Sequence, residues 1–205
     1  MGADLGSLLA GTKHKTVGLD PSGSRARPSG WAFMEGPEVE ARLLRSDEDL
    51  IGLTAGRRPE LVAIDAPLSW PEEGYMREVD RLMHKAGLPV LPPLFPAMRA
   101  LTARGIRLAE ALRSLGLEVI EVHPASTRKV LGLPVKDRRA VQEALVDLGL
   151  RGDVEDRELS MHELDAITAA LTAYIHLLGL SEAIRAGDGE IYVPRRDVRW
   201  RTRGG

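Results

Sequence analysis

Two short apolar segments, each followed by an aspartate, most constrain how this chain can fold. Residues 16–19 (TVGL) precede Asp20, and residues 61–64 (LVAI) precede Asp65. A continuous apolar run of this length, reached through a helix, is typical of a buried strand parallel to the first. Parallel strands in one sheet end at the same edge, where α/β sheets bind ligands. The two carboxylates would repel each other there unless a proton or a divalent cation lies between them.

The other expected elements give an α/β fold with an antiparallel start. Strands at 31–34 and 39–44 follow the first strand through tight turns, which is typical of an antiparallel meander. Residues 88–96 (LPVLPPLFP) cannot form a regular helix because proline removes backbone donors, so we expect an ordered apolar loop. The further expected helices span 50–55, 75–86, 97–115, 126–131, 137–148 and 161–178, and the further strands 117–122 and 190–193.

Composition excludes several classes of protein. The 205 residues carry 28 Lys and Arg against 30 Asp and Glu, a net charge of −2, which argues against a sequence-blind nucleic-acid coat protein. Cysteine is absent, which excludes disulfides and thiolate metal sites. The length is typical of a single domain, which we expect over 1–205. We expect the protein to be located in the cytoplasm because no segment resembles a signal peptide or a membrane span. The chain has no Cys and no Asn, as is common in proteins of heat-adapted organisms.

Further acidic residues extend the candidate site. His162 and Asp165 lie three residues apart at the start of the last long helix, so they share one helix face. Glu121 lies near the end of the strand at 117–122. Each residue also has a purely structural interpretation. Asp20 and Asp65 fit turns or helix caps, Asp165 fits a first-turn acid, Glu121 fits an arginine pair or a solvated site, and His162 fits a hydrogen-bonded bystander.

Five segments together resemble the domain of unknown function 429 family. These are GLDPSGSRARPSGWA, IDAPLSWP, REVDRLMHKAGLPVLPPLFPAMRALTARGIRLA, VIEVHPAS and HELDAITAALTAY, and the resemblance spans about residues 16–194. Members of that family are described as predicted nucleases of the ribonuclease H-like fold. The resemblance implies a mixed five-stranded sheet in the order 3-2-1-4-5, with strand 2 antiparallel and helices on its flanks. It also implies a helical, Pro-rich insertion at about 66–116.

The same resemblance implies a nuclease that depends on Mg²⁺ or Mn²⁺ and acts on DNA or RNA. Asp20 would match the strand-one acid of the superfamily and bridge two ions. Asp65 would match the strand-four acid, which is often Glu, and His162 with Asp165 is similar to the last-helix motif of Holliday-junction resolvases. Glu121 has no secure counterpart but stays among the catalytic candidates. Junction resolvases act as dimers, which implies a homodimer here as well.

Basic residues provide candidate contacts to nucleic acid. Arg25 and Arg27 in the first hairpin are expected to contact phosphates by charge, and the basic tail at 195–205 is a further candidate. Two other functions remain open. An ATP-dependent phosphotransferase of the actin-like group shares this kind of sheet but needs a second phosphate loop, for which the sequence has no clear candidate. A non-catalytic binding module would hold one ion or none.

Overall fold

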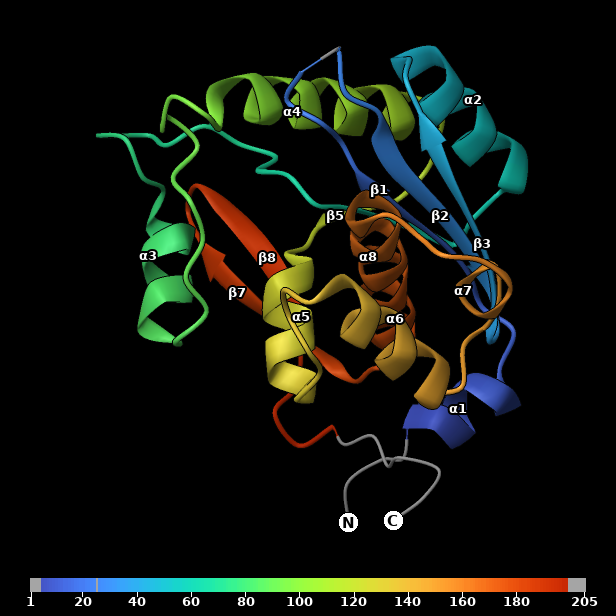
Figure 1. Ribbon diagram of the computed structural model, residues 1–205. Helices are drawn as coiled ribbons and strands as arrows, with labels where there is room; N and C mark the ends of the chain where they lie inside the picture. Colours follow the sequence, from blue (N-terminus) through green and yellow to red (C-terminus); the bar gives the residue numbers. More distant parts are fainter. Residues whose placement is uncertain (1–4, 25, 199–205) are drawn as a thin grey trace.

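The computed structural model describes residues 5–24 and 26–198, and its centre is a mixed sheet of six strands (Figure 1). The strand order is β5-β4-β1-β2-β3-β6, with β2 antiparallel to both neighbours and the remaining pairs parallel. The strands are β1 (Lys15–Asp20), β2 (Ser29–Glu35), β3 (Glu38–Leu44), β4 (Leu61–Ile64), β5 (Val119–Glu121) and β6 (Arg151–Gly152). The first five strands confirm the ribonuclease H-like order 3-2-1-4-5. The expected five-stranded sheet gains a sixth, two-residue strand beside β3.

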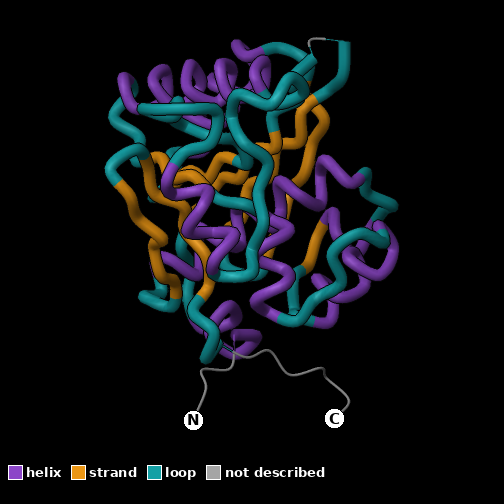
Figure 2. Tube along the Cα trace, turned by 90° about the vertical axis from the view of Figure 1, so that its left-hand side faces the viewer, coloured by secondary structure: helices purple, strands orange, loops and turns teal. Residues whose placement is uncertain are grey.

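Helices cover both faces of this sheet, as Figure 2 shows from the side. The helices α2 and α4 pack on one face, and α8 packs on the other. A separate hairpin of β7 (Ser181–Ala186) and β8 (Gly189–Pro194) approaches β5 through a bridge between Val122 and Tyr192. The helices are α1 (Leu5–Gly11), α2 (Asp47–Arg57), α3 (Glu78–Lys85), α4 (Arg99–Ser114), α5 (Pro124–Leu131), α6 (Arg138–Asp147), α7 (Asp153–Asp156) and α8 (Met161–Leu177). No helix in the described ranges is both long and apolar enough to cross a membrane.

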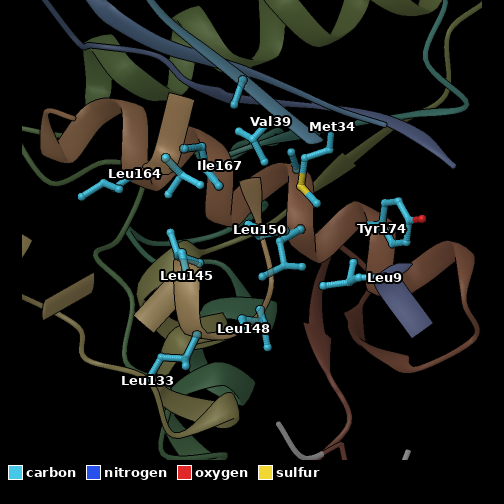
Figure 3. Close-up of a cluster of buried hydrophobic side chains, with 14 of the residues drawn as sticks. Leu9, Met34, Val39, Leu133, Leu145, Leu148, Leu150, Leu164, Ile167 and Tyr174 are labelled. Carbon is cyan, nitrogen blue, oxygen red and sulfur yellow. The ribbon is translucent and has the colours of Figure 1, made fainter. Parts of the chain in front are cut away.

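The apolar core beneath the sheet fixes the position of α8. Figure 3 shows Leu164 and Ile167 of α8 between Met34 of β2 on one side and Leu145 of α6 on the other. Residues of α8 are buried along nearly the whole helix, which explains why its sequence is apolar on every face. This helix therefore has little freedom to shift relative to the strands.

Close contact between α8 and the sheet depends on two glycines. A Cβ atom at Gly18 of β1 would lie 2.0 Å from the Ala166 carbonyl oxygen, and one at Gly30 of β2 would lie 1.9 Å from the His162 carbonyl oxygen. Small residues on α8 and glycines on the strands thus bring two backbones together. This contact places the start of α8 beside the end of β1.

We expect Gly30→Ala to destabilise the protein by about 1–3 kcal/mol, because the new methyl group forces α8 away from β2. Chemical denaturation measures this change in the free energy of unfolding. Gly52→Ala at an exposed position of α2 is the matched control, since no atom outside its own helical turns lies within 4 Å of the new Cβ. That control should be neutral or slightly stabilising, by up to about 1 kcal/mol. Equal effects of the two substitutions would contradict the role of close packing at Gly30.

Candidate active site

Asp20 and Asp65 lie together at the carboxyl edge of the sheet. The strands β1 and β4 are parallel, Leu19 pairs with Ile64, and the Asp65 amide donates to the Leu19 carbonyl at 2.8 Å. Each aspartate therefore lies one residue beyond the last pair between β1 and β4. Side chains alternate along a strand, and Leu19 and Ile64 both face α2 and α4. The structure thus brings the two aspartates together on the side of the sheet that α8 covers.

The first turn of α8 supplies His162 and Asp165. Ser160 caps the helix by accepting a hydrogen bond from the Glu163 amide, and the Glu163 carboxylate accepts in return from the Ser160 amide at 2.9 Å. Glu163 therefore stabilises the start of α8 as part of a capping box. His162 points to β1 instead, and its Nδ1 lies 2.5 Å from Oδ2 of Asp20. The expected shared face of His162 and Asp165 is therefore directed at the strand ends.

Burial raises the pKa values of three carboxyl groups in the site, and repulsion by neighbouring acids adds to the rise at two of them. Burial is the main cause for Asp20, whose pKa rises from 3.8 to about 6, while His162 opposes the rise and Asp165 adds to it. Burial also raises the pKa of Asp65 well above its ordinary value, and the charges of Asp20 and Asp165 raise it further. Burial raises the pKa of Asp165 too. The hydrogen bond to Asp20 raises the pKa of His162. The cluster therefore binds protons or other cations readily.

Arg128 of α5 is a buried counterion that the sequence did not indicate. Its Nη2 donates to Oδ1 of Asp165 at 2.7 Å and to the Val135 carbonyl at 3.2 Å, and its Nη1 donates to Oγ1 of Thr168 at 3.0 Å. Its charge lowers the pKa values of Asp20, Asp65 and Asp165 and so offsets part of their repulsion. Nothing in its local sequence distinguishes it from neighbouring basic residues, because its partners on α8 are 37 and 40 residues away.

Glu121 forms a buried ion pair, which is one of the structural interpretations that the sequence left open. Arg77 binds both of its oxygens, with Nη1 to Oε2 at 2.8 Å and Nη2 to Oε1 at 2.5 Å. The Leu68 amide donates to Oε2 as well, at 2.8 Å. Arg77 also contacts Asp80, with Nη2 to Oδ1 at 2.7 Å. Glu121 is therefore held as part of the wall of the site.

The Asp65 carboxylate differs from the other acids because the described residues offer it no hydrogen-bond donor or ion-pair partner, and only charges at a distance act on it. Asp20 is bound by His162, Asp165 by Arg128 and Glu121 by Arg77. In their present side-chain positions, no three His, Asp or Glu residues of the described chain converge as a metal site. The donor chemistry nevertheless fits a hard divalent cation, since an unpartnered carboxylate lies beside two others that repel it.

A cavity of about 190 Å³ opens beside these acids. Asp20 and Asp65 line one part of it, and Arg77, Asp80 and Glu121 line another. Most of the remaining wall is apolar, and the Pro-rich loop and the start of α4 contribute part of it. The loop that sequence analysis expected to be ordered and apolar therefore forms one side of the candidate site.

The basic candidates have different positions. Arg27 is exposed, and its charge is near enough to lower the pKa of His162, although other causes dominate there. Arg25 lies outside the described residues, as does the part of the basic tail at 199–205. Within the described part of the tail, Arg195 pairs with Asp197 at 3.1 Å, and Arg196 donates to the Ala86 carbonyl at 2.6 Å.

The pKa shifts predict how the stability of the metal-free protein depends on pH. Folded Asp20 and His162 bind protons more tightly than their unfolded forms, so the free energy of unfolding falls as pH rises. For Asp20 this fall lies between 3.8 and about 6. Asp20→Asn removes both contributions, so we expect a flatter pH dependence in chemical denaturation with EDTA. Identical pH profiles of the variant and the natural protein would contradict this electrostatic account.

Comparison with known proteins identifies the family. Residues 18–188 match the family described as "Protein of unknown function (DUF429)", and the chain belongs to this family. Among solved structures, it is similar to T. thermophilus RuvC in complex with a Holliday junction substrate, at 18% identity over 81% of this chain and 96% of that one, with a TM-score of 0.42. A second structure, of Thermus thermophilus RuvC, is similar at 21% identity over 80% of this chain and 96% of that one, with a TM-score of 0.38. The search of curated proteins finds no match.

Proposed function

We propose that this protein is a divalent-metal-dependent nuclease that hydrolyses phosphodiester bonds in DNA or RNA. The observation that carries the proposal is the unpartnered Asp65 carboxylate beside Asp20 and Asp165 at the carboxyl edge of the sheet. Such a group is costly to bury as an anion unless a cation accompanies it. The electrostatics of the edge thus favour a cation, and the open cavity beside it gives a substrate access.

Asp20 and Asp65 would hold Mg²⁺ or Mn²⁺. Asp165 would complete the centre by leaving Arg128 and turning to the ion. A divalent ion bound here supplies Lewis acidity and a hydroxide nucleophile at neutral pH. His162 contacts the Asp20 carboxylate through Nδ1 and can accept or release a proton there, since the hydrogen bond to Asp20 raises its pKa. The positive charge of Arg128 would then offset the charge of any carboxylate in the site that does not bind the ion.

Nucleic acid is the proposed substrate because basic side chains lie next to the acidic edge. Arg27 lies near His162. A second hollow, of about 440 Å³, lies beside Ser22. Arg45 and the exposed Arg107 line it together with the acids Asp47 and Glu48, and its Arg104 is already paired with Asp47 at 2.7 Å. Arginines in such positions bind phosphate oxygens without reading sequence. The homodimer, the single domain and the cytoplasmic location remain predictions from the sequence.

The test uses purified protein with a panel of labelled single strands, duplexes, hybrids and junctions. We expect cleavage in Mg²⁺ or Mn²⁺ and none in EDTA, because the carboxylates alone supply no nucleophile. Calorimetric titration with Mn²⁺ in the absence of nucleic acid should show binding at the same time. A protein that binds no Mn²⁺ and cleaves no member of the panel would refute the proposal. A rise in thermal stability with ATP and Mg²⁺, but not with Mg²⁺ alone, would instead favour the phosphotransferase.

A further inference from the structure

The cavity beside Asp20 and Asp65 has the size and lining of a site for one small ring system. Its volume of about 190 Å³ is below the ~300–1,000 Å³ of ordinary drug-sized ligand pockets. Val90 and Leu91 of the Pro-rich loop, Met98 and Leu101 near the start of α4, and Ile191 of β8 supply apolar walls. The space therefore suits a flat apolar group better than a whole nucleotide.

The charges around the cavity exclude a phosphate from it. Among the described residues that line it, Arg77 is the only one with a permanent positive charge, and both Asp80 and Glu121 already bind that guanidinium. An anion entering this space would meet an excess of negative charge, whereas a neutral base would not. His123 also lines the cavity, and burial lowers its pKa to about 4, so its ring is neutral.

The rim of the cavity leaves apolar surface uncovered. Leu91 is 55% exposed although it lines the cavity, and Met98 is half-buried. Covering such side chains with a flat ring removes apolar surface from water, which is favourable at about 25 cal/mol per Å². Pro92 and Pro93 are buried next to Leu91, so the loop that presents this rim is anchored. The rim is thus a fixed apolar surface next to the acids.

We propose that this cavity receives one base of the substrate strand, unstacked from its neighbours, while the adjoining phosphodiester lies at Asp20 and Asp65. This inference rests on the proposed nuclease function and specifies its substrate class. An unpaired or easily unpaired nucleotide is required, because a base inside a continuous duplex cannot enter a side pocket without the cost of unpairing and unstacking. Apolar walls accept any base, so the site selects strand distortion over sequence.

The experiment uses a DNA duplex with a single-nucleotide bulge that carries 2-aminopurine, whose fluorescence is quenched by stacking. Wild-type protein in Ca²⁺ should raise this fluorescence severalfold on binding. By anisotropy, it should bind the bulge about tenfold more tightly than the same duplex with an abasic bulge. Leu91→Ala combined with Met98→Ala should remove this preference. Phe95→Ala is the matched control, because Phe95 is exposed on the same loop but does not line the cavity.

Equal affinity of the wild-type protein for the base-bearing and abasic bulges would overturn the base pocket. So would a preference that survives in the Leu91 and Met98 double variant. Mn²⁺ binding and cleavage of the substrate panel, measured on the same preparations, separate this failure from failure of the nuclease proposal. A protein that binds Mn²⁺ and cleaves the base-bearing and abasic bulges equally well would refute the pocket alone. A protein that binds neither Mn²⁺ nor any oligonucleotide refutes both.

Discussion

Asp65→Asn should reduce Mg²⁺-dependent cleavage about a thousandfold or more, because a bound divalent ion supplies several kcal/mol of transition-state stabilisation. The amide retains the size of the side chain but removes the charge that attracts the cation. Calorimetry should show a parallel loss of Mn²⁺ affinity. Asp49→Asn, an exposed acid on α2 away from the cavity, is the matched control and should leave both properties unchanged.

The same substitution should also stabilise the metal-free protein at neutral pH. Burial and the charges of Asp20 and Asp165 raise the pKa of Asp65, so its ionised form is unfavourable in the folded state. Loss of metal binding together with a gain in stability is the signature of a ligand, and a merely structural aspartate would lose stability instead. A destabilised Asp65→Asn protein with normal Mn²⁺ affinity would contradict the assignment.

Arg77→Met should lower the free energy of unfolding by about 3–5 kcal/mol, the usual cost of leaving a buried ion pair without one partner. Arg77 is 1% exposed, and its loss leaves the Asp80 and Glu121 carboxylates buried without their cation. Arg77→Lys should restore the charge but only part of the stability, because an ammonium group cannot make the same forked contacts. Chemical denaturation measures all three proteins.

The matched control for this prediction is Arg81→Met on α3, the helix that Arg77 precedes as its N-cap residue. Arg81 also pairs with an acid three residues away, Glu78, at 3.1 Å, but both side chains are about half exposed. An exposed pair contributes at most about 1 kcal/mol. Similar losses of stability at Arg77 and Arg81 would show that burial of the Arg77 ion pairs does not make them contribute more than an exposed pair.

The strands β1 and β4 and the meeting of Asp20 with Asp65 could be predicted because they follow from local pattern, whereas the strand order was implied by the family resemblance. Apolar runs define β1 and β4, and parallel strands share a carboxyl edge. Side chains alternate along a strand, so Glu121 lies on the same face of the sheet as Val119. Val119 packs against the face that α2 and α4 cover, whereas the two aspartates lie on the opposite face.

The partners of the acids could not be predicted because they depend on tertiary contacts. Arg77 reaches Glu121 across 44 residues, and Arg128 reaches Asp165 across 37. No local periodicity marks either arginine. The strand β7 was missed because its side chains are partly exposed throughout and lack a clear alternation, and β6 has only two residues. The 1–4 and 199–205 segments, with Arg25, lie outside the described residues.

A crystal soaked in MnCl₂ shows whether Asp20 and Asp65 together bind a divalent cation. Anomalous scattering locates manganese without any assumption about activity. We predict a peak in contact with the carboxylates of both Asp20 and Asp65, with Asp165 turned from Arg128 toward it. A fully occupied manganese elsewhere, with the edge between Asp20 and Asp65 empty, would contradict the proposed metal-dependent chemistry.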